Sequence, residues 1–279
     1  MSYKIVVDSC GELSEEMKAS GHFESAPLII DVNGEQIVDD ETFDQKSFLK
    51  KVKESPVGPK TSCPSPERYM KAFHCDADHV YAVTLSAKLS GSYNSAVLGK
   101  NLHEEEYGEK PIHVVDSCSA SVGQTLLAMK IQECEEAGMS FEQTVETVES
   151  YKEEQNTYFV LETLETLRKN GRISGVKAAV ASTLHIHPVM GATPEGEIVQ
   201  LGNARGMKRA LIKMVDHIVK EVKNSEEKIL GISHCNCPEK AKQVRDMILE
   251  KINVKASIIQ DTAGISSTYA NDGGIIVVI

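Results

Sequence analysis

One segment of ten residues, "KTSCPSPERY" (60–69), combines small hydroxyl groups with a thiol and two prolines. Ser65 followed by Pro66 has the pattern of a helix N-cap and first helical position, which gives Ser65 a structural role. Thr61 and Ser62 lie before that cap and are not needed for it. Their hydroxyls can serve either a turn or an anionic ligand, and the segment alone leaves both interpretations open.

A second hydroxyl-rich segment, "LSAKLSGSYNSA" (85–96), follows an apolar run that is typical of a buried strand. Ser90, Gly91 and Ser92 stand directly before a helical pattern. A helix N-terminus with a glycine and flanking serines can bind an anion, although simple capping by Ser92 is the commoner use of this spacing. If both segments meet at one edge of a sheet, their neutral donors can bind a carboxylate or phosphate without a buried ion pair.

The residues offer two other kinds of site. A hydrolase of acyl esters could use Ser92 or Cys63 as its nucleophile, but there is no G-x-S-x-G motif and no histidine beside either residue. A zinc site could use His234, Cys235 and Cys237, but their C-x-C spacing has no second cysteine pair to complete it. The residues favour anion binding over both of these interpretations.

Cationic side chains occur in "RKNGRISG" and "NARGMKRAL". Arg172 follows Gly171, which has the pattern of a helix C-cap. Arg205, Lys208 and Arg209 stand at the start of a long helical pattern, where positive charge opposes the helix dipole at a cost of a few tenths of a kcal/mol. That arrangement indicates either the docking of an anionic group or partner, or a solvated helix face.

The elements that must position these residues alternate between strands and helices. Asn33-Gly34 between two alternating runs predicts a hairpin, and Ser140 with Gln143 predicts a capping box. Short β-branched runs separated by amphipathic segments predict an α/β protein whose sheets are largely parallel or mixed, with a division near the polar run at 155–160. The predicted buried strands of the first half are 3–7, 79–85 and 112–117, and those of the second half begin near 157.

Composition limits the class of protein. The chain has 279 residues and a formal net charge of −11, which argues against a general nucleic-acid binder because phosphate affinity comes largely from Lys and Arg. Its seven scattered cysteines suit reduced thiols. The N-terminus lacks the pattern of a signal peptide, and no apolar run approaches the roughly 20 residues of a membrane span. We therefore expect a cytoplasmic protein without stable membrane insertion.

The chain resembles the DegV family of bacterial fatty-acid-binding proteins. The resemblance rests on six segments in a fixed order: "VVDSCGEL", "KTSCPSPERY", "LSAKLSGSYNSA", "VVDSCSASVGQ", "LETLRKNGRISG" and "NARGMKRAL". It implies two α/β domains, 1–157 with carboxylate-binding loops and 158–279 with the acyl-chain pocket, and one bound long-chain fatty acid with no other cofactor and no metal. Members of the FakB type present the carboxylate to a separate fatty acid kinase, which makes an acyl phosphate for phospholipid synthesis. The chain itself would be a carrier.

Carried over residue by residue, the resemblance implies that the carboxylate is bound by Thr61, Ser62, Ser90, Gly91 and Ser92. Arg172 is expected near the ligand, and Arg205 in handling the acyl phosphate or docking the kinase. The acyl tunnel could be lined by Phe159, Leu161, Leu164, Leu167, Ile173, Val180, Leu184 and Ile186.

The sequence departs from the family pattern in two places. Cys63 stands where a glutamine is usual. The C-terminal segment "DTAGISSTYANDGG" lacks the family's His-x-Gly-Pro-Gly motif, whose histidine contacts the carboxylate. The hydroxyl residues that could replace this histidine are Thr262, Ser266, Ser267 and Thr268.

Overall fold

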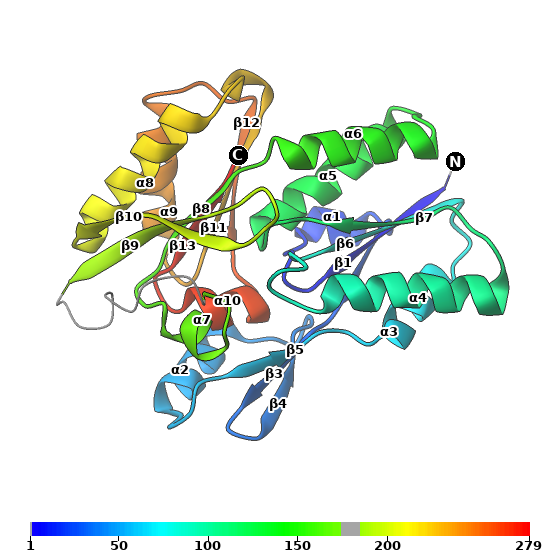
Figure 1. The fold of residues 1–279 in the computed structure, drawn as a ribbon, viewed down its shortest axis with the longest axis horizontal. Helices are drawn as coiled ribbons and strands as arrows, with labels where there is room; N and C mark the ends of the chain where they lie inside the picture. The colour runs from blue at the N-terminus through cyan, green and yellow to red at the C-terminus, as the bar shows by residue number, and fades with distance from the viewer. Residues whose placement is uncertain (1, 174–184) are drawn as a thin grey trace.

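A computed structural model describes residues 2–173 and 185–279, and three β-sheets organise them (Figure 1). The first sheet is four-stranded and entirely parallel, in the order β2-β1-β6-β7. Its strands are β1 (Tyr3–Asp8), β2 (Phe23–Ala26), β6 (His79–Thr84) and β7 (Ile112–Asp116). The buried β-branched runs that predicted β1, β6 and β7 are confirmed.

Helices cover both faces of this parallel sheet. Strand residues such as Ile5 and Val7 pack against one group of helices, and Val6 and Val80 against the other. The first group consists of α1 (Glu15–Ala19), α5 (Val122–Glu136) and α6 (Phe141–Glu153), and the second of α3 (Pro66–Phe73) and α4 (Ser92–Tyr107). The predicted caps are present, since Ser65 accepts the Arg68 N–H and Ser140 forms a capping box with Gln143.

A separate, small antiparallel sheet has three strands in the order β4-β3-β5. It contains β3 (Ile29–Val32), β4 (Glu35–Val38) and β5 (Lys60–Ser62), with α2 (Gln45–Glu54) between β4 and β5. Asn33 and Gly34 have φ values of 55° and 86°, as a type I′ hairpin requires, which confirms the predicted turn. Thr61 and Ser62, expected in a loop, instead lie on β5, where Thr61 pairs with Ile30.

The third sheet has six strands in the order β10-β9-β8-β13-β11-β12, all antiparallel except the β11–β12 pair. They are β8 (Thr157–Val160), β9 (Ile186–Ala192), β10 (Ile198–Arg205), β11 (Ile229–His234), β12 (Ala256–Asp261) and β13 (Ile275–Val278). The described helices of this half are α7 (Glu165–Lys169), α8 (Met207–Glu221), α9 (Pro238–Leu249), α10 (Gly264–Ala270) and the 3₁₀ turn η2 (Ser225–Glu227).

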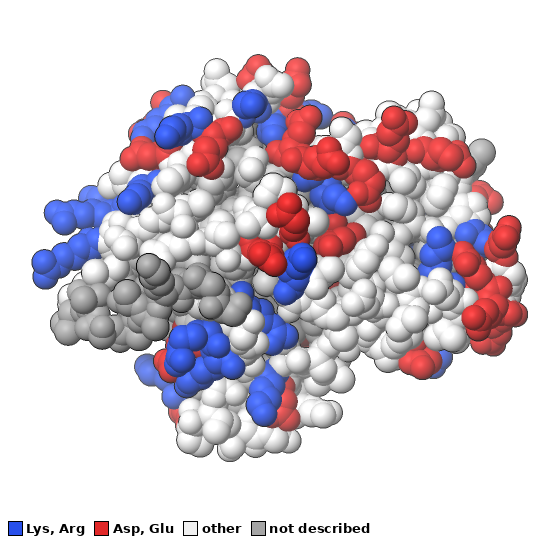
Figure 2. Space-filling model, in the orientation of Figure 1, with Lys and Arg blue, Asp and Glu red and all other residues white. Residues whose placement is uncertain are grey.

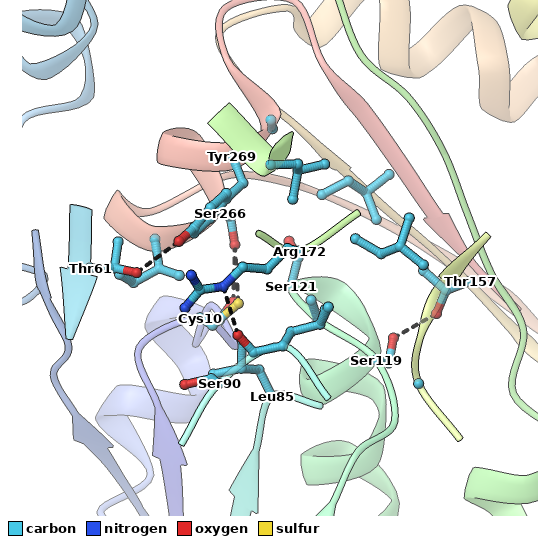
Figure 3. A pocket seen from close by; sticks show the side chains of 18 of the residues that line it. Cys10, Thr61, Leu85, Ser90, Ser119, Ser121, Thr157, Arg172, Ser266 and Tyr269 are labelled. Atoms are coloured by element: carbon cyan, nitrogen blue, oxygen red, sulfur yellow. Dashed lines mark hydrogen bonds between the residues drawn. The ribbon is translucent and has the colours of Figure 1, made fainter. Parts of the chain in front are cut away.

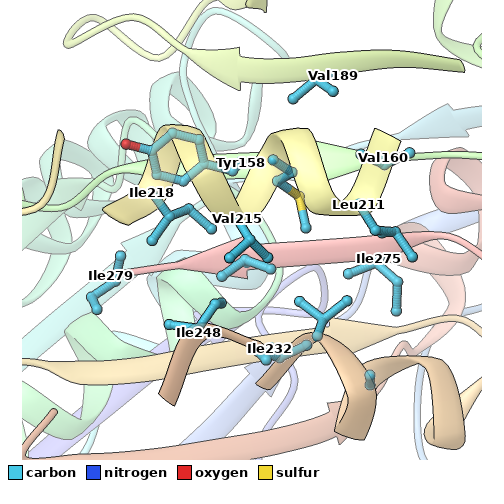
Figure 4. Close-up of a cluster of buried hydrophobic side chains, with 14 of the residues drawn as sticks. Tyr158, Val160, Val189, Leu211, Val215, Ile218, Ile232, Ile248, Ile275 and Ile279 are labelled. Atoms are coloured by element: carbon cyan, nitrogen blue, oxygen red, sulfur yellow. The ribbon is translucent and has the colours of Figure 1, made fainter. Parts of the chain in front are cut away.

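The largest apolar core lies between this mixed sheet and helices α8 and α9 (Figure 4). Val160, Ile232 and Ile275 project from the strands toward Leu211 and Val215 of α8. On the opposite side of the sheet, α5 packs against β11 and β13. A parallel sheet and a mixed sheet, each flanked by helices, confirm the expected α/β fold class.

Strands β1–β7 precede residue 157, β8 begins at Thr157 and β9–β13 follow it, but the domain boundary between 157 and 158 stays a prediction. The sequence "SGVKAAVASTL" (174–184) has the pattern of a helix, but this segment lies outside the described residues. Among the helices that the structure describes, none has the length and apolar character to cross a membrane.

Candidate ligand-binding cavity

A cavity of about 340 Å³ lies where the three sheets meet (Figure 3). This volume is within the range of small-molecule binding sites. The parallel sheet contributes the loops after β1, β6 and β7, the small sheet contributes β5, and the mixed sheet contributes β8–β10 and α10. Most of the wall is apolar and includes Leu28, Leu85, Leu89, Phe159, Leu161, Leu167, Ile198, Ile265, Ala270 and Ile276.

The strand order explains why the loops after β1 and β6 reach one place. The chain runs from β1 to β2 on one side and then crosses to β6 on the other side of β1. In open α/β sheets a crevice forms at the carboxyl ends of the strands where the order reverses in this way. Cys10 follows β1, Leu85 and Ser90 follow β6, and all three line the cavity.

Hydroxyl groups cluster on one part of the wall. Four of the residues predicted to bind the carboxylate line the cavity. They are Thr61 and Ser62 on β5, and Ser90 and Gly91 before α4. Gly91 is the N-cap residue of α4 and, as a glycine, forms no capping hydrogen bond through a side chain. A Cβ at this glycine would lie 3.3 Å from the Cys63 sulfur, so the small residue allows the thiol and the helix start to approach each other.

Ser92, also a predicted ligand residue, lies outside the cavity wall. It is fully buried; its hydroxyl donates to Oδ2 of Asp8 across 2.6 Å and lies 2.7 Å from the Tyr69 hydroxyl. Asp8 also accepts the Leu85 N–H at 2.8 Å and the Gln124 amide at 2.8 Å. Burial raises the pKa of Asp8, and these donors oppose the rise. Asp8 also accepts the Cys10 N–H, which forms an Asx turn.

Of the four C-terminal hydroxyl residues predicted to replace the histidine, Ser266 alone lines the cavity. Its hydroxyl donates to the Cys10 carbonyl at 3.1 Å. Thr262 and Ser267 are buried and bond to each other at 2.7 Å, and Thr268 donates to the Gly264 carbonyl within α10. These three side chains stabilise the start and body of the helix instead of facing the cavity.

Tyr269 is a cavity residue that the sequence reasoning missed. Its phenol oxygen lies 2.8 Å from Oγ1 of Thr61, which joins α10 to β5 at the cavity wall (Figure 3). Ser119 and Thr157 form a second hydroxyl pair at 2.6 Å on another part of the wall. The predicted helix capping and strand patterns gave no sign of these pairs, because each joins segments far apart in the sequence.

The two predicted arginines differ in position. Arg172 lines the cavity and its Nε donates to the Leu89 carbonyl at 3.0 Å. Arg205 is exposed at the end of β10 and does not line the cavity. Of the predicted tunnel residues, Phe159, Leu161 and Leu167 line the cavity. Leu164, Ile173 and Ile186 do not, and Val180 and Leu184 lie outside the described residues.

The alternative sites gain no support from the geometry. Cys63 contacts Ser95 at 3.6 Å, and Ser92 bonds to Asp8 and Tyr69, so neither nucleophile pairs with a histidine within the described ranges. The zinc interpretation fails for a similar reason. His234 accepts the Cys237 N–H at 3.3 Å, and residues 2–173 and 185–279 contain no group of three side chains able to hold a metal ion.

Two further buried carboxylates lie close behind the wall. Glu12 accepts the Ser121 hydroxyl and the Gln260 amide, each at 2.9 Å, and burial raises its pKa to about 7. Asp39 accepts backbone N–H groups of α10, and burial raises its pKa to about 6. Neither lines the cavity, so the part of the cavity wall formed by described residues offers hydroxyls and one arginine rather than acids.

The chain matches the family model described as the uncharacterised DegV family over residues 2–279. A DegV domain-containing protein of Streptococcus gordonii is 35% identical over 279 residues, covering 99% of this chain and 98% of the relative.

Solved structures resemble the fold over nearly its whole length. A DegV family protein from Ruminococcus gnavus, refined with vaccenic acid, is 60% identical with a TM-score of 0.98 and complete coverage of both chains. The Streptococcus pneumoniae fatty acid kinase B3 protein, loaded with linoleic acid, is 32% identical with a TM-score of 0.90, covering 100% of this chain and 99% of that one. A DegV family protein from Eubacterium eligens, loaded with heptadecanoic acid, is 28% identical with a TM-score of 0.90 and 99% coverage of each chain.

Proposed function

Because the chain belongs to the DegV family, we propose that it binds one long-chain fatty acid and carries it in the cytosol as a carrier rather than an enzyme. The acyl chain occupies the apolar cavity, and the carboxylate lies against the hydroxyls of Thr61, Ser62 and Ser90 and the start of α4 at Gly91. The observation that carries this proposal is a leucine- and isoleucine-rich cavity with uncharged hydrogen-bond donors gathered on part of its wall. The 60% identical R. gnavus structure with vaccenic acid supports it.

The energetics of this cavity suit a lipid acid. Each buried CH₂ group contributes about 0.8 kcal/mol, so a chain of about 16 carbons offsets the cost of association. Neutral hydroxyl and N–H donors make charge-assisted bonds to the carboxylate without the desolvation cost of a second buried ion. The N-terminus of α4 adds a favourable dipole for an anion.

Lipid extraction tests the proposal. Denatured protein should release about one fatty acid per chain, detected by mass spectrometry, after purification from cells supplied with fatty acids. Ile198→Trp should fill the cavity and lower this occupancy, because Ile198 lines it. Val199→Trp is the matched control, since Val199 is the next residue on β10 and does not line the cavity. Wild-type protein free of lipid after feeding and after incubation with fatty acid would contradict the proposal.

We further propose that the bound carboxylate is presented to a separate fatty acid kinase, which makes an acyl phosphate for phospholipid synthesis. The supporting observation is the charge on the face in Figure 2. Lys and Arg gather around α7 and at the ends of β10 and α8 on a chain of net charge −11. The exposed cations of α7, of the last residue of β10 and of the first turn of α8 are Arg168, Lys169, Arg205, Lys208 and Arg209.

Kinase-dependent formation of acyl phosphate, trapped with hydroxylamine, tests this second proposal. Arg205→Ala/Arg209→Ala should lower the rate at limiting carrier concentration while leaving fatty-acid occupancy unchanged. Lys220→Ala/Lys223→Ala removes two exposed cations near the other end of α8 and serves as the control. Equal losses in the two double variants would contradict a docking role for the first pair.

A further inference from the structure

Helix α10 brings the C-terminal part of the chain to the cavity. Its side chains Ile265, Ser266, Tyr269 and Ala270 line the wall. Tyr269 is half-buried, and its phenol is hydrogen-bonded to Thr61, one of the proposed carboxylate ligands. The position of this helix therefore decides where the phenol stands relative to the proposed head-group site.

The start of α10 is held by a residue from another part of the chain. Its N-cap, Ala263, has no side-chain oxygen to accept the first free N–H groups. Asp39 supplies both acceptors, with Oδ1 2.6 Å from the Gly264 nitrogen and Oδ2 2.8 Å from the Ile265 nitrogen. Asp39 is 2% exposed and lies 225 positions before Gly264, so the cap joins the two halves of the chain.

The fit between Asp39 and α10 is close. A Cβ at Gly264 would stand 2.5 Å from Oδ1 of Asp39 and 2.8 Å from Cδ1 of Ile30, nearer than such atoms approach. Glu12 accepts the Ala263 N–H at 3.2 Å, and Gln45 donates to the Thr262 carbonyl at 2.8 Å. The start of α10 is thus fixed by three side chains from the first half of the chain.

We infer that Tyr269 binds the carboxylate of the fatty acid and that Asp39 is a positioning residue that holds the phenol in place for this contact. The inference rests on the proposed function. Two hydroxyls joined by one hydrogen bond contain two protons, and their mutual bond uses one of them. The other proton is left for a further acceptor, and no second partner for the pair occurs among the described residues. A carboxylate at Thr61 is such an acceptor.

The chemistry of the pair favours a charged head group. In a chain from Thr61 to Tyr269 to the ligand, each hydrogen bond polarises the next, and the phenol donates to a negative oxygen. Tyr269 would then supply a donor in the segment that lacks the family histidine. Hydrogen bonds weaken steeply as their distance and angle degrade, so a small shift of α10 would reduce this contact.

The test compares two probes with the same chain, cis-vaccenic acid and cis-vaccenyl alcohol, by measuring the affinity of each for delipidated full-length protein. Wild type should prefer the acid. Tyr269→Phe should lower that preference roughly tenfold, the scale of one hydrogen bond to a charged group, with little change for the alcohol. Asp39→Asn should act in the same direction, because an amide keeps one acceptor where the helix offers two donors. The double variant should show no further loss.

Two control variants distinguish a displaced Tyr269 phenol from a general loss of structure. Asp40→Asn changes the neighbouring acid, which bonds to Thr42 and not to α10, and should leave the preference unchanged. Gly264→Ala displaces the helix without removing a charge, and it should lower the preference for the acid as much as Asp39→Asn does. It therefore tests the positioning role even if Asp39→Asn does not fold. Failure of wild type to bind the acid would overturn the proposed function. An unchanged acid preference in Tyr269→Phe and Gly264→Ala, or additive losses in the double variant, would overturn this inference alone.

Discussion

The hydroxyl of Ser92 donates to Oδ2 of Asp8 across 2.6 Å, and neither side chain has any exposed surface. Asp8 ends β1 and Ser92 begins α4, so this bond fixes the helix against the strand at the edge where the cavity forms. The Ser-Gly-Ser pattern therefore divides into two roles. Ser90 and Gly91 line the cavity, while Ser92 supports them from behind.

Ser92→Ala should lower stability more than ligand retention. The change leaves the Asp8 carboxylate and the Tyr69 hydroxyl each without one partner, and a buried group left unsatisfied costs about 1–3 kcal/mol. Urea unfolding of the delipidated protein measures this loss. Ser90→Ala should show the opposite pattern, with a small change in stability and a faster release of fatty acid. Equal effects of the two variants on both measurements would contradict the division of roles.

Thr61→Ala/Ser62→Ala should release bound fatty acid by removing the proposed Ser62 donor and the Thr61 hydroxyl that is hydrogen-bonded to Tyr269. The rate of transfer to lipid vesicles, followed by mass spectrometry, should rise about tenfold or more. Ser65→Ala is the matched control three residues further on, because Ser65 caps α3 and does not line the cavity. It should cost about 1 kcal/mol of stability with unchanged release. Unchanged occupancy in the double variant would remove Thr61 and Ser62 from the site.

The pH dependence of stability should reveal Glu12. Burial raises its pKa from 4.5 to about 7, so the folded protein holds a proton there over a range in which the unfolded chain has lost it. The contribution of Glu12 to stability is therefore fully present below pH 4.5 and is lost as the pH rises through 7. The glutamine of the Glu12→Gln variant has no carboxyl group to titrate at this position. The stability of wild type relative to this variant should fall by up to about 3 kcal/mol between pH 4.5 and 8, measured by urea unfolding, and parallel pH profiles would refute this.

Thiol accessibility should report whether the cavity is filled. All seven cysteines are free, and Cys63 and Cys118 are half-buried residues of the cavity wall. Alkylation by N-ethylmaleimide, mapped by mass spectrometry, should label both more slowly in lipid-loaded protein than in delipidated protein. Cys75 is half-buried away from the cavity and should react at one rate in both states. A uniform change at all three sites would point to unfolding rather than occupancy.

Features governed by neighbours in the sequence were predicted well. The Asn33-Gly34 turn, the Ser65-Pro66 helix start and the Ser140 capping box each depend on a few adjacent residues, and all are present. The alternation of apolar runs likewise predicted most strands and helices of the α/β fold, because burial of one face imposes its own period. Thr61, Ser62, Ser90 and Gly91 were brought to one cavity as expected.

Features governed by distant residues were not predicted. Helix α10 has no local cap, since Asp39 provides it from 225 positions away, and so the segment gave no sign of a helix start. Strand β5 is three residues long and owes its extended form to pairing with β3 rather than to its composition. Tyr269 was overlooked for the same reason, because its importance depends on where that helix lies.

The place of β13 in the mixed sheet has a consequence for how the protein folds. This strand comes last along the chain, yet it lies between β8 and β11 and pairs with both. During synthesis β8 emerges early in this half, and its edge stays unpaired until residues 275–278 follow. Such long-range pairing slows folding and leaves strand edges exposed to aggregation. Since Ile276 of β13 and the nearby helix α10 both line the cavity, the cavity wall lacks these side chains until β13 and α10 are in place.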